Sequence, residues 1–440
     1  MFNRLGVVFV ALFVSVGLVS AQNDGFLPPL PEDEAITLTY FNYNLASAGI
    51  GAEGTQQLID EFMELYPNVT IDGIGVPSTD IMSRTQADIV AGTPPDIAQL
   101  VFDDLAFIVD NLGVQALETL VPPEEFEAHI SGMHPNGIAL GQLDGSTYGL
   151  AYTFSTPVLF YNADIFREAG LDPDVPPRTW QEVQAYALQI VENTDHMGFF
   201  PGVYGQFDWM WQGVVLSNGG RVLSEDRSTL TFAEEPGIEA AQMLRDLFES
   251  GAHADIAPGD DFTAMAAGGL GMYLQTSAVQ NFLINSAEGN YEIRAAQMPG
   301  FGDTPSVPTN SGSALFILTD DPLKARAAWE FMKFVTSKRG YTIITSQIGY
   351  LPLRPEIVDE EEFLLGWAQE NPLVYPNLEQ LDRLQPWESI PGPNYKQIVS
   401  IMMNALEEAV YGDGDVADIM QEAQRRGQEL MPSRSEERRV

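Results

Sequence analysis

Strand-like and helix-like segments alternate along the first hundred residues, and this alternation constrains the fold more than any other feature of the chain. Residues 36–44, 69–76 and 96–102 are rich in β-branched and aromatic residues, as strands are. A helical pattern that Pro67 ends lies between the first two segments, and a second helical pattern covers 79–91. This order predicts a parallel sheet covered by helices.

The second half of the chain continues in the same style. Thr179 and Glu182 have the spacing of a capping box, which predicts a helix from residue 180. Residues 313–318 read as a strand, and Asp321 is expected to cap a helix that runs to Gly340. The last eighty residues are largely helical in pattern. The whole chain is therefore expected to belong to the α/β class.

The two ends differ from the body of the chain. Residues 1–21 have an early cation, an apolar run and small residues before a cleavage point, which is the pattern of a secretory signal peptide. Residues 22–35 are rich in proline and acid and predict a flexible leader, and 433–440 predict a charged tail. Without cysteine, lipid attachment through an N-terminal cysteine and disulfides are excluded. We expect a soluble periplasmic or extracellular protein.

The length and the net charge of the chain restrict its domain organisation and the ligands that it can bind. A chain of 440 residues exceeds what one core usually holds, so two domains are expected. The formal net charge of −41 argues against binding of nucleic acid or anionic lipid, since both require basic patches. Because the acids are spread along the chain, a salt-adapted surface is a better interpretation than a site for cations.

Catalytic motifs are missing from the sequence. The four histidines are scattered without a metal-binding spacing, and neither a cysteine nucleophile nor a G-x-S-x-G motif is present. We expect no metal and no cofactor. A pair of glycosidase carboxylates could still be hidden among the 62 acids, so a secreted carbohydrate-active enzyme stays open as an alternative.

Aromatic residues stand next to small polar ones where the predicted strands end. In open α/β sheets ligands bind beyond the carboxyl ends of strands, and aromatic faces beside hydroxyl and amide groups suit a neutral polyol or sugar. Taken singly, each residue could equally belong to a core. The candidates are Tyr43, Asn44, Asp103, Trp209, Trp211, Tyr273, Thr276 and Ser277.

Several segments, in this order along the chain, resemble a known family. They are "AGTPPDIAQL" (91–100), "YGLAYTFSTPVLFYNADIFREAGLDPDVPPRTWQEV" (148–183), "FTAMAAGGLGMY" (262–273), "SGSALFIL" (311–318), "AWEFMKFVTS" (328–337) and "GYLPLRPEIV" (349–358). Through them the chain resembles the extracellular solute-binding proteins of family 1, the carbohydrate-type receptors of ABC importers. The closing segments "ALEEAVYGDGD" and "AQRRGQELM" are especially similar to the glycerol-3-phosphate-binding branch.

The resemblance implies a two-lobe periplasmic-binding-protein fold, type II-like, with a ligand cleft between the lobes. Each lobe would hold a mostly parallel sheet flanked by helices. Lobe 1 would comprise 36–150 plus 303–350, and lobe 2 would comprise 151–302 plus 351–432. The strand that carries Ser155 would cross between the lobes at the hinge, and closure around the ligand is the motion to expect.

The resemblance also implies site residues. Ser155, Thr276 or Ser277, Gly312 and Tyr350 stand at positions that match ligand contacts of the glycerol-3-phosphate branch. Two positions depart from that pattern. Phe102 replaces an expected carboxylate, with Asp103 one step on, and Gly392 stands about where an arginine is expected, with Lys396 nearby. A phosphate monoester calls for a bidentate arginine or a helix N-terminus, so these departures weaken the phosphate interpretation.

The leading functional hypothesis is therefore a non-enzymatic binding protein. It would capture a sugar or oligosaccharide, with Trp209, Trp211 and Tyr273 as stacking surfaces, and deliver it as a monomer to an ABC membrane permease. A second hypothesis keeps glycerol-3-phosphate or its diesters as the ligand, with Lys396 or backbone amides holding the anion. The carbohydrate-active enzyme is the alternative of another class.

Overall fold

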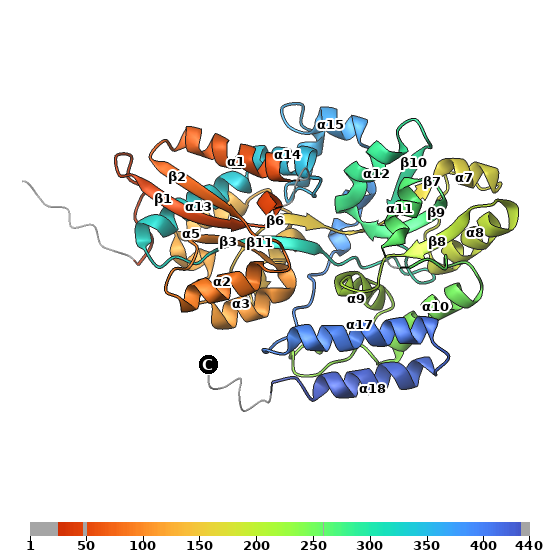
Figure 1. The fold of residues 1–440 in the computed structure, drawn as a ribbon. Helices are drawn as coiled ribbons and strands as arrows, with labels where there is room; N and C mark the ends of the chain where they lie inside the picture. Colours follow the sequence, from red (N-terminus) through yellow and green to blue (C-terminus); the bar gives the residue numbers. More distant parts are fainter. Residues whose placement is uncertain (1–24, 47–50, 258, 433–440) are drawn as a thin grey trace, which may run out of the picture.

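A computed structural model describes residues 25–46, 51–257 and 259–432. The predictions for the signal peptide and for the charged tail lie outside these residues. Figure 1 shows two lobes side by side, with strands passing between them and a pair of helices beneath.

Lobe 1 is built on a five-stranded sheet in the order β2-β1-β3-β11-β6. Its strands are β1 (Ile36–Asn42), β2 (Val69–Gly75), β3 (Ile97–Val101), β6 (Leu150–Ser155) and β11 (Ser311–Ile317). β1 is parallel to β2 and β3, whereas β11 is antiparallel to β3 and to β6. Four strands therefore run in one direction, and only β11 is reversed.

Lobe 2 is built on a four-stranded sheet in the order β10-β7-β9-β8. Its strands are β7 (Pro157–Asn162), β8 (Met197–Pro201), β9 (Leu270–Thr276) and β10 (Ile293–Gln297). β7 is antiparallel to β10 and β9, and β8 is parallel to β9. Each lobe therefore holds a mixed sheet with one reversed strand. The predicted mostly parallel character holds for the strand directions, whereas in lobe 2 two of the three neighbouring pairs are antiparallel. In both lobes the reversed strand follows a chain segment coming from the other lobe.

Helices cover both sheets, with a short hairpin of β4 (Gln142–Leu143) and β5 (Ser146–Thr147) on lobe 1 (Figure 1). The helices of lobe 1 are α1 (Ala52–Leu65), α2 (Ile81–Val90), α3 (Leu105–Asn111), α4 (Leu117–Leu120), α5 (Pro123–Ile130), α6 (Pro135–Ala139), α13 (Pro322–Val335) and α14 (Lys338–Ile343). The remaining helices are α7 (Ala163–Glu168), α8 (Trp180–Asn193), α9 (Asp208–Ser217), α10 (Glu235–Glu249), α11 (Asp260–Ala266), α12 (Gln280–Ala287), α15 (Leu365–Glu370), α16 (Val374–Glu379), α17 (Tyr395–Tyr411) and α18 (Val416–Gln428).

The helix starts follow the local signals in the sequence. Thr179 and Glu182 form the predicted capping box at the start of α8, each side chain accepting a hydrogen bond from the other residue's backbone amide. Asp321 caps α13 by accepting from two backbone amides of the first turn. The expected continuation to Gly340 is wrong, because α13 ends at Val335 and Ser337 caps a separate helix, α14.

One crossing between the lobes is a strand interrupted at a single residue. β6 and β7 are buried along their whole length, and only Thr156 stands between them. β6 pairs within the lobe 1 sheet, so lobe 1 extends to Ser155 rather than to residue 150. Arg354 donates to the carbonyls of Ser131 and Thr336 in lobe 1, so the chain after residue 350 also begins on lobe 1 rather than on lobe 2.

The described part of the predicted leader is attached to lobe 1. The backbone amide of Leu27 donates to the carbonyl of Leu120 at 2.8 Å. Asn68 Nδ2 donates to the carbonyls of Pro31 at 2.8 Å and Glu34 at 3.1 Å. Residues 25–35 are thus tied to the lobe by hydrogen bonds, which differs from the flexible segment expected.

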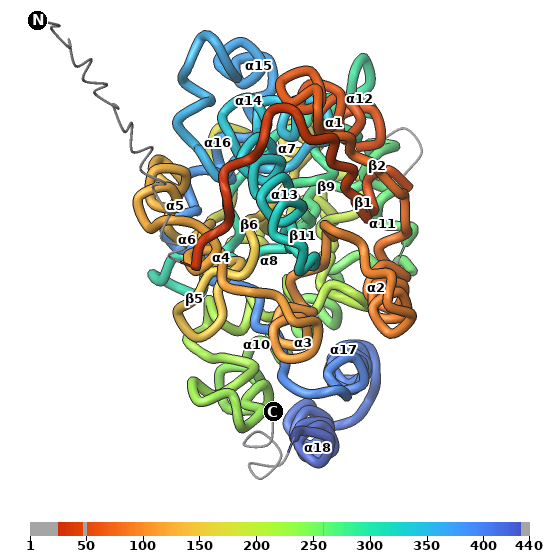
Figure 2. Tube along the Cα trace, turned by 90° about the vertical axis from the view of Figure 1, so that its left-hand side faces the viewer, coloured from red at the N-terminus to blue at the C-terminus, as the bar shows by residue number. Residues whose placement is uncertain are grey.

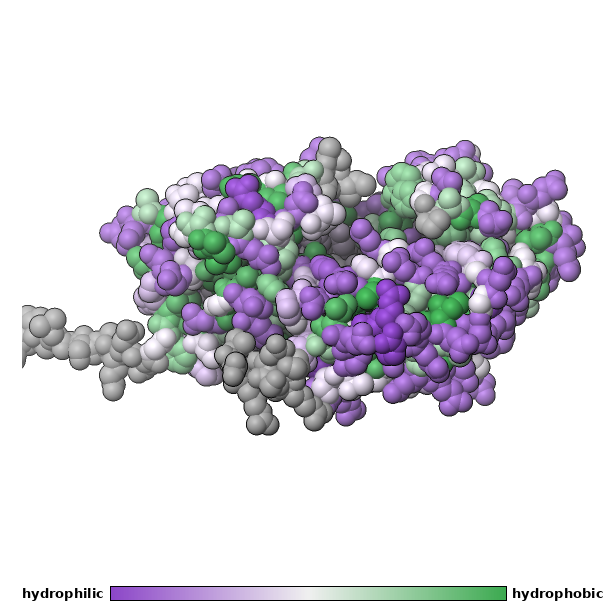
Figure 3. Space-filling view, turned by 60° about the horizontal axis from the view of Figure 1, so that its bottom comes forward, coloured by the Kyte–Doolittle hydropathy of each residue, from purple (hydrophilic) through white to green (hydrophobic). Residues whose placement is uncertain are grey.

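The C-terminal helices α17 and α18 form a hairpin that packs against α10 of lobe 2 (Figure 2). α17 buries an apolar stripe of Ile398, Met402, Ala405, Leu406 and Ala409. Figure 3 shows mostly hydrophilic residues over the face on which this hairpin lies, in keeping with the acid excess. Within the described ranges, no helix combines the length and apolar character needed to cross a membrane.

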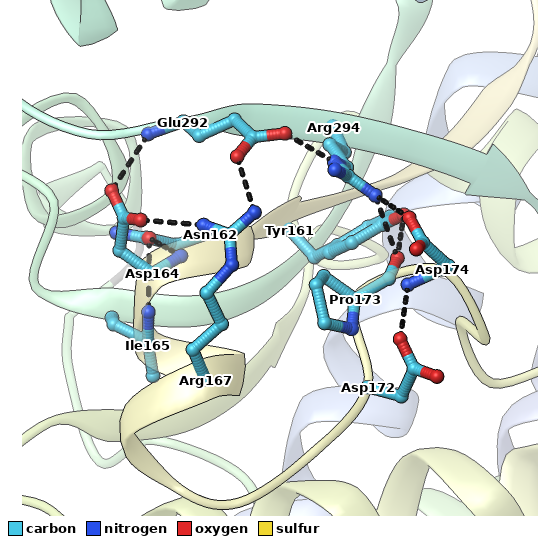
Figure 4. A network of polar contacts seen from close by, with 10 residues as sticks. All are labelled: Tyr161, Asn162, Asp164, Ile165, Arg167, Asp172, Pro173, Asp174, Glu292 and Arg294. Carbon is cyan, nitrogen blue, oxygen red and sulfur yellow. Dashed lines mark hydrogen bonds and ion pairs between the residues drawn. The ribbon is translucent and has the colours of Figure 1, made fainter.

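Several residues of the motif segment 148–183 form a network of polar contacts on lobe 2 (Figure 4). Asn162 ends β7 and caps α7, since its Oδ1 accepts from the amides of Asp164 at 3.0 Å and Ile165 at 3.2 Å. Arg167 bonds to Asp164 at 2.7 Å and to Glu292, just before β10, at 2.5 Å. The second half of the motif therefore fastens α7 to the edge of the sheet.

Replacing the cap should reveal this structural role. In Asn162→Ala the first turn of α7 loses its side-chain acceptor, so the free energy of unfolding should fall by about 1 kcal/mol. Denaturant unfolding followed by circular dichroism measures the change. Asn162→Ser keeps a capping oxygen and should lose markedly less. Equal losses in the two variants would contradict the capping role.

Candidate functional site

Three of the candidate site residues, Ser155, Thr276 and Ser277, come together where the two lobes meet. Ser155 ends β6, and Thr276 ends β9 in the other lobe. Thr276 Oγ1 donates to Ser155 Oγ at 2.7 Å, which joins the two strand ends directly. Ser277, the next residue, exchanges hydrogen bonds with Thr156: its amide donates to the carbonyl of Thr156 at 2.9 Å, and its Oγ accepts from the amide of Thr156 at 3.2 Å.

Thr156, at the centre of the crossing, is also held from the C-terminal connection. Its Oγ1 donates to Asn377 Oδ1 at 3.0 Å and accepts from Gln380 Nε2 at 2.9 Å. All three side chains are fully buried. The crossing thus has buried polar contacts on both sides, and every group in them is uncharged.

A second group of neutral polar side chains lies at the strand ends of lobe 1. Tyr43 follows β1, and its hydroxyl bonds to Thr153 Oγ1 at 3.0 Å and to Ser313 Oγ at 3.1 Å. Gln99, in the middle of β3, donates to Asn44 Oδ1 at 2.8 Å and to Ser313 Oγ at 2.8 Å. The group therefore includes two predicted residues, Tyr43 and Asn44, and three that were missed.

Tyr350 extends this group toward the crossing. The residue after it, Leu351, donates its amide to the carbonyl of Phe154 in β6 at 3.0 Å. Burial, together with the contact to Tyr43, raises the pKa of Tyr350 well above its usual value, and burial raises the pKa of Tyr43 as well. Both phenols are therefore neutral hydrogen-bonding groups at physiological pH.

Gly312 is required by the backbone at its position. It has φ of +119°, and a Cβ there would lie 2.0 Å from the carbonyl oxygen of Thr153. β11 makes its register shift against β6 one residue further on, between Ser313 and Ala314. Close pairing of the two strands explains the glycine, independently of any ligand contact.

Acidic side chains gather at the other end of the junction. Asp103 and Asp104 follow β3 and bond to Lys396 Nζ, at the start of α17, at 2.5 Å and 3.1 Å. Asp208, at the start of α9, accepts from Trp387 Nε1 at 2.9 Å. This acid cluster of Asp103, Asp104 and Asp208, with Lys396, links lobe 1 to α9 and to the C-terminal hairpin.

Burial dominates the electrostatics of the acid cluster. It raises the pKa of Asp103 to about 7, with the charge of Asp104 adding to the effect and that of Lys396 opposing it. Burial likewise raises the pKa of Asp208 to about 6, against the hydrogen bond from Trp387. Asp103 Oδ1 has no hydrogen-bond partner among the residues that the structure describes. The described ranges contain no group of three or more acidic or histidine side chains placed to hold a metal ion.

The expectation that Trp209, Trp211 and Tyr273 offer stacking surfaces is wrong for this conformation. Their exposed fractions are 2%, 0% and 0%. α9, which carries both tryptophans, is buried on all sides, as an all-round apolar helix should be. Tyr273 donates its hydroxyl to Asp261 Oδ2 at 2.5 Å inside lobe 2.

Several polar residues of the junction were not predicted from the sequence, for two different reasons. Gln99 had a signal, since it is the one amide inside the apolar strand segment "IAQLV". Thr153 and Ser313 belong to strand segments without such a contrast. Asn377 and Gln380 had no signal, because they meet Thr156 across more than two hundred residues of sequence.

Known proteins share this architecture. The cyclic alpha-maltosyl-1,6-maltose binding protein from Arthrobacter globiformis superposes with a TM-score of 0.78 at 22% identity, over 90% of this chain and 99% of that one. UgpB from Mycobacterium tuberculosis, in complex with glycerophosphocholine, superposes with a TM-score of 0.75 at 21% identity, over 90% and 98%. The predicted two-lobe periplasmic-binding-protein fold is confirmed.

Sequence comparison gives the family. The sn-glycerol-3-phosphate-binding periplasmic protein UgpB of Pectobacterium atrosepticum is 24% identical over 298 residues, and the match spans 64% of this chain and 65% of that protein. The family described as bacterial extracellular solute-binding protein matches residues 48–342. The chain therefore belongs to the bacterial extracellular solute-binding protein family.

Proposed function

We propose that this protein is the substrate-binding protein of an ABC importer, which captures a sugar or oligosaccharide between its lobes and presents it to a membrane permease. The observation that carries the proposal is the direct contact of Ser155 with Thr276, at 2.7 Å across the two lobes, within a junction of neutral hydroxyl and amide groups. It would act outside the cytoplasm, as a monomer, after removal of residues 1–21, and needs no cofactor.

The chemistry of the junction favours a neutral ligand rich in hydroxyls. Ser155, Thr276 and Tyr43 can each donate and accept, as sugar hydroxyls do. On opening of the hinge at Thr156, a ligand can take over the hydrogen bonds that these side chains now make with one another. Ser277 is hydrogen-bonded to Thr156 beside that position, and Gly312 permits the close pairing of β11 with β6.

The acid cluster beside the junction also favours a ligand without negative charge. Lys396 is the basic residue of the acid cluster, and Asp103 and Asp104 both hold it. A phosphate dianion would have to compete with two carboxylates for one ammonium group, next to the further acid Asp208. A ligand without negative charge meets no such competition.

A second candidate is a receptor for glycerol-3-phosphate or a glycerophosphodiester. It is favoured by the similarity to the UgpB protein of Pectobacterium atrosepticum and by the shared fold with the glycerophosphocholine complex. In this case Lys396 would leave one of its aspartates to hold the phosphate. A fluorescence response to glycerol-3-phosphate that weakens with salt, and no response to sugars, would favour this candidate.

An enzyme is the candidate of another class. Asp103 and Asp208 both have raised pKa values, and a raised pKa is a property of the general acid of a glycosidase. The hydrogen bonds of Asp103 with Lys396 and of Asp208 with Trp387 account for their positions without catalysis. Incubation with oligosaccharides, followed by chromatography, would reveal cleavage and thereby overturn the binding proposal.

The binding proposal predicts a sugar-dependent change in intrinsic tryptophan fluorescence, because closure of the lobes moves α9 and its two tryptophans relative to the crossing. Ser155→Ala should weaken sugar binding and raise the dissociation constant roughly five- to tenfold, as expected for one lost hydrogen bond of about 1 kcal/mol. Titration with mono- and oligosaccharides measures this.

Ser286→Ala is the matched control, because Ser286 lies in α12 and its hydroxyl donates only to a helix carbonyl. It should bind the sugar as the parent protein does. The site assignment fails if both variants bind equally well, and the sugar proposal fails if no sugar changes the fluorescence.

The acid cluster predicts a pH dependence of stability. The folded-state pKa of Asp103, about 7, lies above its ordinary value of 3.8. The stability linked to this raised pKa is therefore fully present below pH 3.8 and is lost as the pH rises through about 7. Asp103→Asn cannot ionise, so its free energy of unfolding should fall less between pH 5 and pH 8 than that of the parent protein.

Denaturant unfolding at the two pH values measures this difference. Asp60→Asn, a change at an exposed position of α1, is the control and should follow the parent protein at both values. If Asp103→Asn loses as much stability as the parent, burial does not govern the titration of Asp103.

A further inference from the structure

A chain of buried hydrogen bonds runs from helix α11 of lobe 2 to Thr276 at the junction of the lobes. α11 packs against β9, the strand that Thr276 ends (Figure 1). The chain starts at Asp261 in α11, passes through Tyr273 and Gln275 in β9, and ends at the backbone amide of Thr276. The exposed fractions of Asp261, Tyr273 and Gln275 are 6%, 0% and 4%, so bulk water hardly competes for these bonds.

The groups themselves determine which partner donates in each bond of this chain. Both oxygens of Asp261 accept, Oδ1 from the amide of Gly259 at 2.7 Å and Oδ2 from the Tyr273 hydroxyl at 2.5 Å. Burial raises the pKa of Tyr273, and the hydrogen bond to Asp261 adds to the effect, so the phenol keeps its proton. Gln275 Nε2 then donates to the Tyr273 oxygen at 2.8 Å.

The carboxamide of Gln275 is oriented from both of its ends. Its Nε2 faces an oxygen whose own hydrogen already points to Asp261, and its Oε1 accepts from the amide of Thr276 at 2.8 Å. A turned carboxamide would bring its NH₂ group against the N–H of Thr276, two donors facing each other. The carboxylate at the start of the chain therefore determines the group that Gln275 presents to Thr276.

Thr276 depends on this side-chain acceptor because the sheet ends beside it. The pairing of β8 with β9 stops at Pro201, short of Thr276. On its other side Thr276 faces Pro157 of β7, which has no N–H. Gly202 leaves room for the carboxamide of Gln275, since a Cβ there would lie 2.8 Å from Nε2. The local backbone thus keeps Gln275 beside the amide that it holds.

The placement of Thr276 sets the direction of the hydrogen bond across the lobes. Its Oγ1 accepts from the amide of Ala278 at 3.3 Å and donates to Ser155 Oγ at 2.7 Å. Within the described residues the Ser155 hydroxyl accepts this bond and donates to no other group. Its own hydrogen is therefore available to an acceptor oxygen, such as a hydroxyl or ether oxygen of a sugar.

We propose that Asp261, Tyr273 and Gln275 are positioning residues of the ligand site, which hold Thr276 so that Ser155 presents its hydroxyl hydrogen to an acceptor oxygen of the ligand. They act through Thr276 and not by contact with the ligand. This inference rests on the proposed function, and it gives Tyr273 a role at the site other than stacking. Without the Tyr273 hydroxyl, the carboxamide of Gln275 can turn, and the Thr276 amide loses its acceptor.

Tyr273→Phe tests the chain, because it removes the hydroxyl and keeps the ring. In the ligand-free protein, residue-resolved amide hydrogen exchange at Thr276 should be roughly fivefold faster, as expected for one neutral hydrogen bond, and the rest of β9 should change less. Gln275→Met removes the acceptor at similar volume and should have the same effect. The two changes combined should add little to either one alone, since they interrupt one chain.

Binding of maltose and maltotetraose, followed by tryptophan fluorescence, supplies the readout at the site. Tyr273→Phe and Gln275→Met should each raise the dissociation constant roughly two- to fivefold, because Thr276 and Ser155 keep their hydroxyls but lose their fixed orientation. The effect should be smaller than that of Ser155→Ala, which removes the contact itself.

Tyr291→Phe is the matched control. The Tyr291 hydroxyl donates to the carbonyl of Met265 in α11 at 2.7 Å, so this variant loses a tyrosine hydrogen bond to the same helix outside the chain. It should leave Thr276 exchange and sugar binding unchanged. The positioning role is overturned if Tyr273→Phe exchanges at Thr276 as the parent does, or if it binds sugar as tightly as Tyr291→Phe. If the parent binds neither sugar, the sugar proposal fails, and the exchange result alone decides the positioning role.

Discussion

The continuous buried strand β6–Thr156–β7 is the constraint on which the rest of the structure depends. Its two halves are hydrogen-bonded into different sheets, so this strand joins the two lobes covalently at a buried point. The residue at the break cannot leave its polar groups unsatisfied in that environment. Asn377, Gln380 and Ser277 provide its partners, which explains why neutral polar side chains collect around the crossing.

The crossing strand determines both the position and the chemistry of the candidate site. Strand ends from both lobes meet beside it, so a ligand placed there contacts both bodies at once, and binding is coupled to their relative orientation. A charged ligand would pay a desolvation cost at a buried junction whose own groups are neutral. The ion pairs lie to one side, in the acid cluster, where Lys396 offsets part of the carboxylate charge.

The sequence predicted those features that depend on neighbours within a few residues. The strand and helix alternation, the capping box of α8 and the cap of α13 are local, and they were predicted correctly. The two tryptophans of α9 were misjudged because an aromatic residue at a strand end and one in a helix buried on all sides look alike in sequence. The contacts of Thr156 with Asn377 and Gln380 were out of reach, because only the tertiary fold brings these residues together.

The excess of acidic residues explains where the few basic residues are placed. Acids exposed over the whole surface repel one another, so a folded chain of this charge gains from cations at the points where its elements meet. Arg167 and Arg294 join α7 and the Pro-rich turn to β10, and Arg326 with Lys333 joins α13 to Glu125 of α5. Lys396 does the same between the lobes. Dissolved salt screens the repulsion between distant surface acids more than it screens these short, partly buried contacts, so we expect added salt to stabilise such a chain.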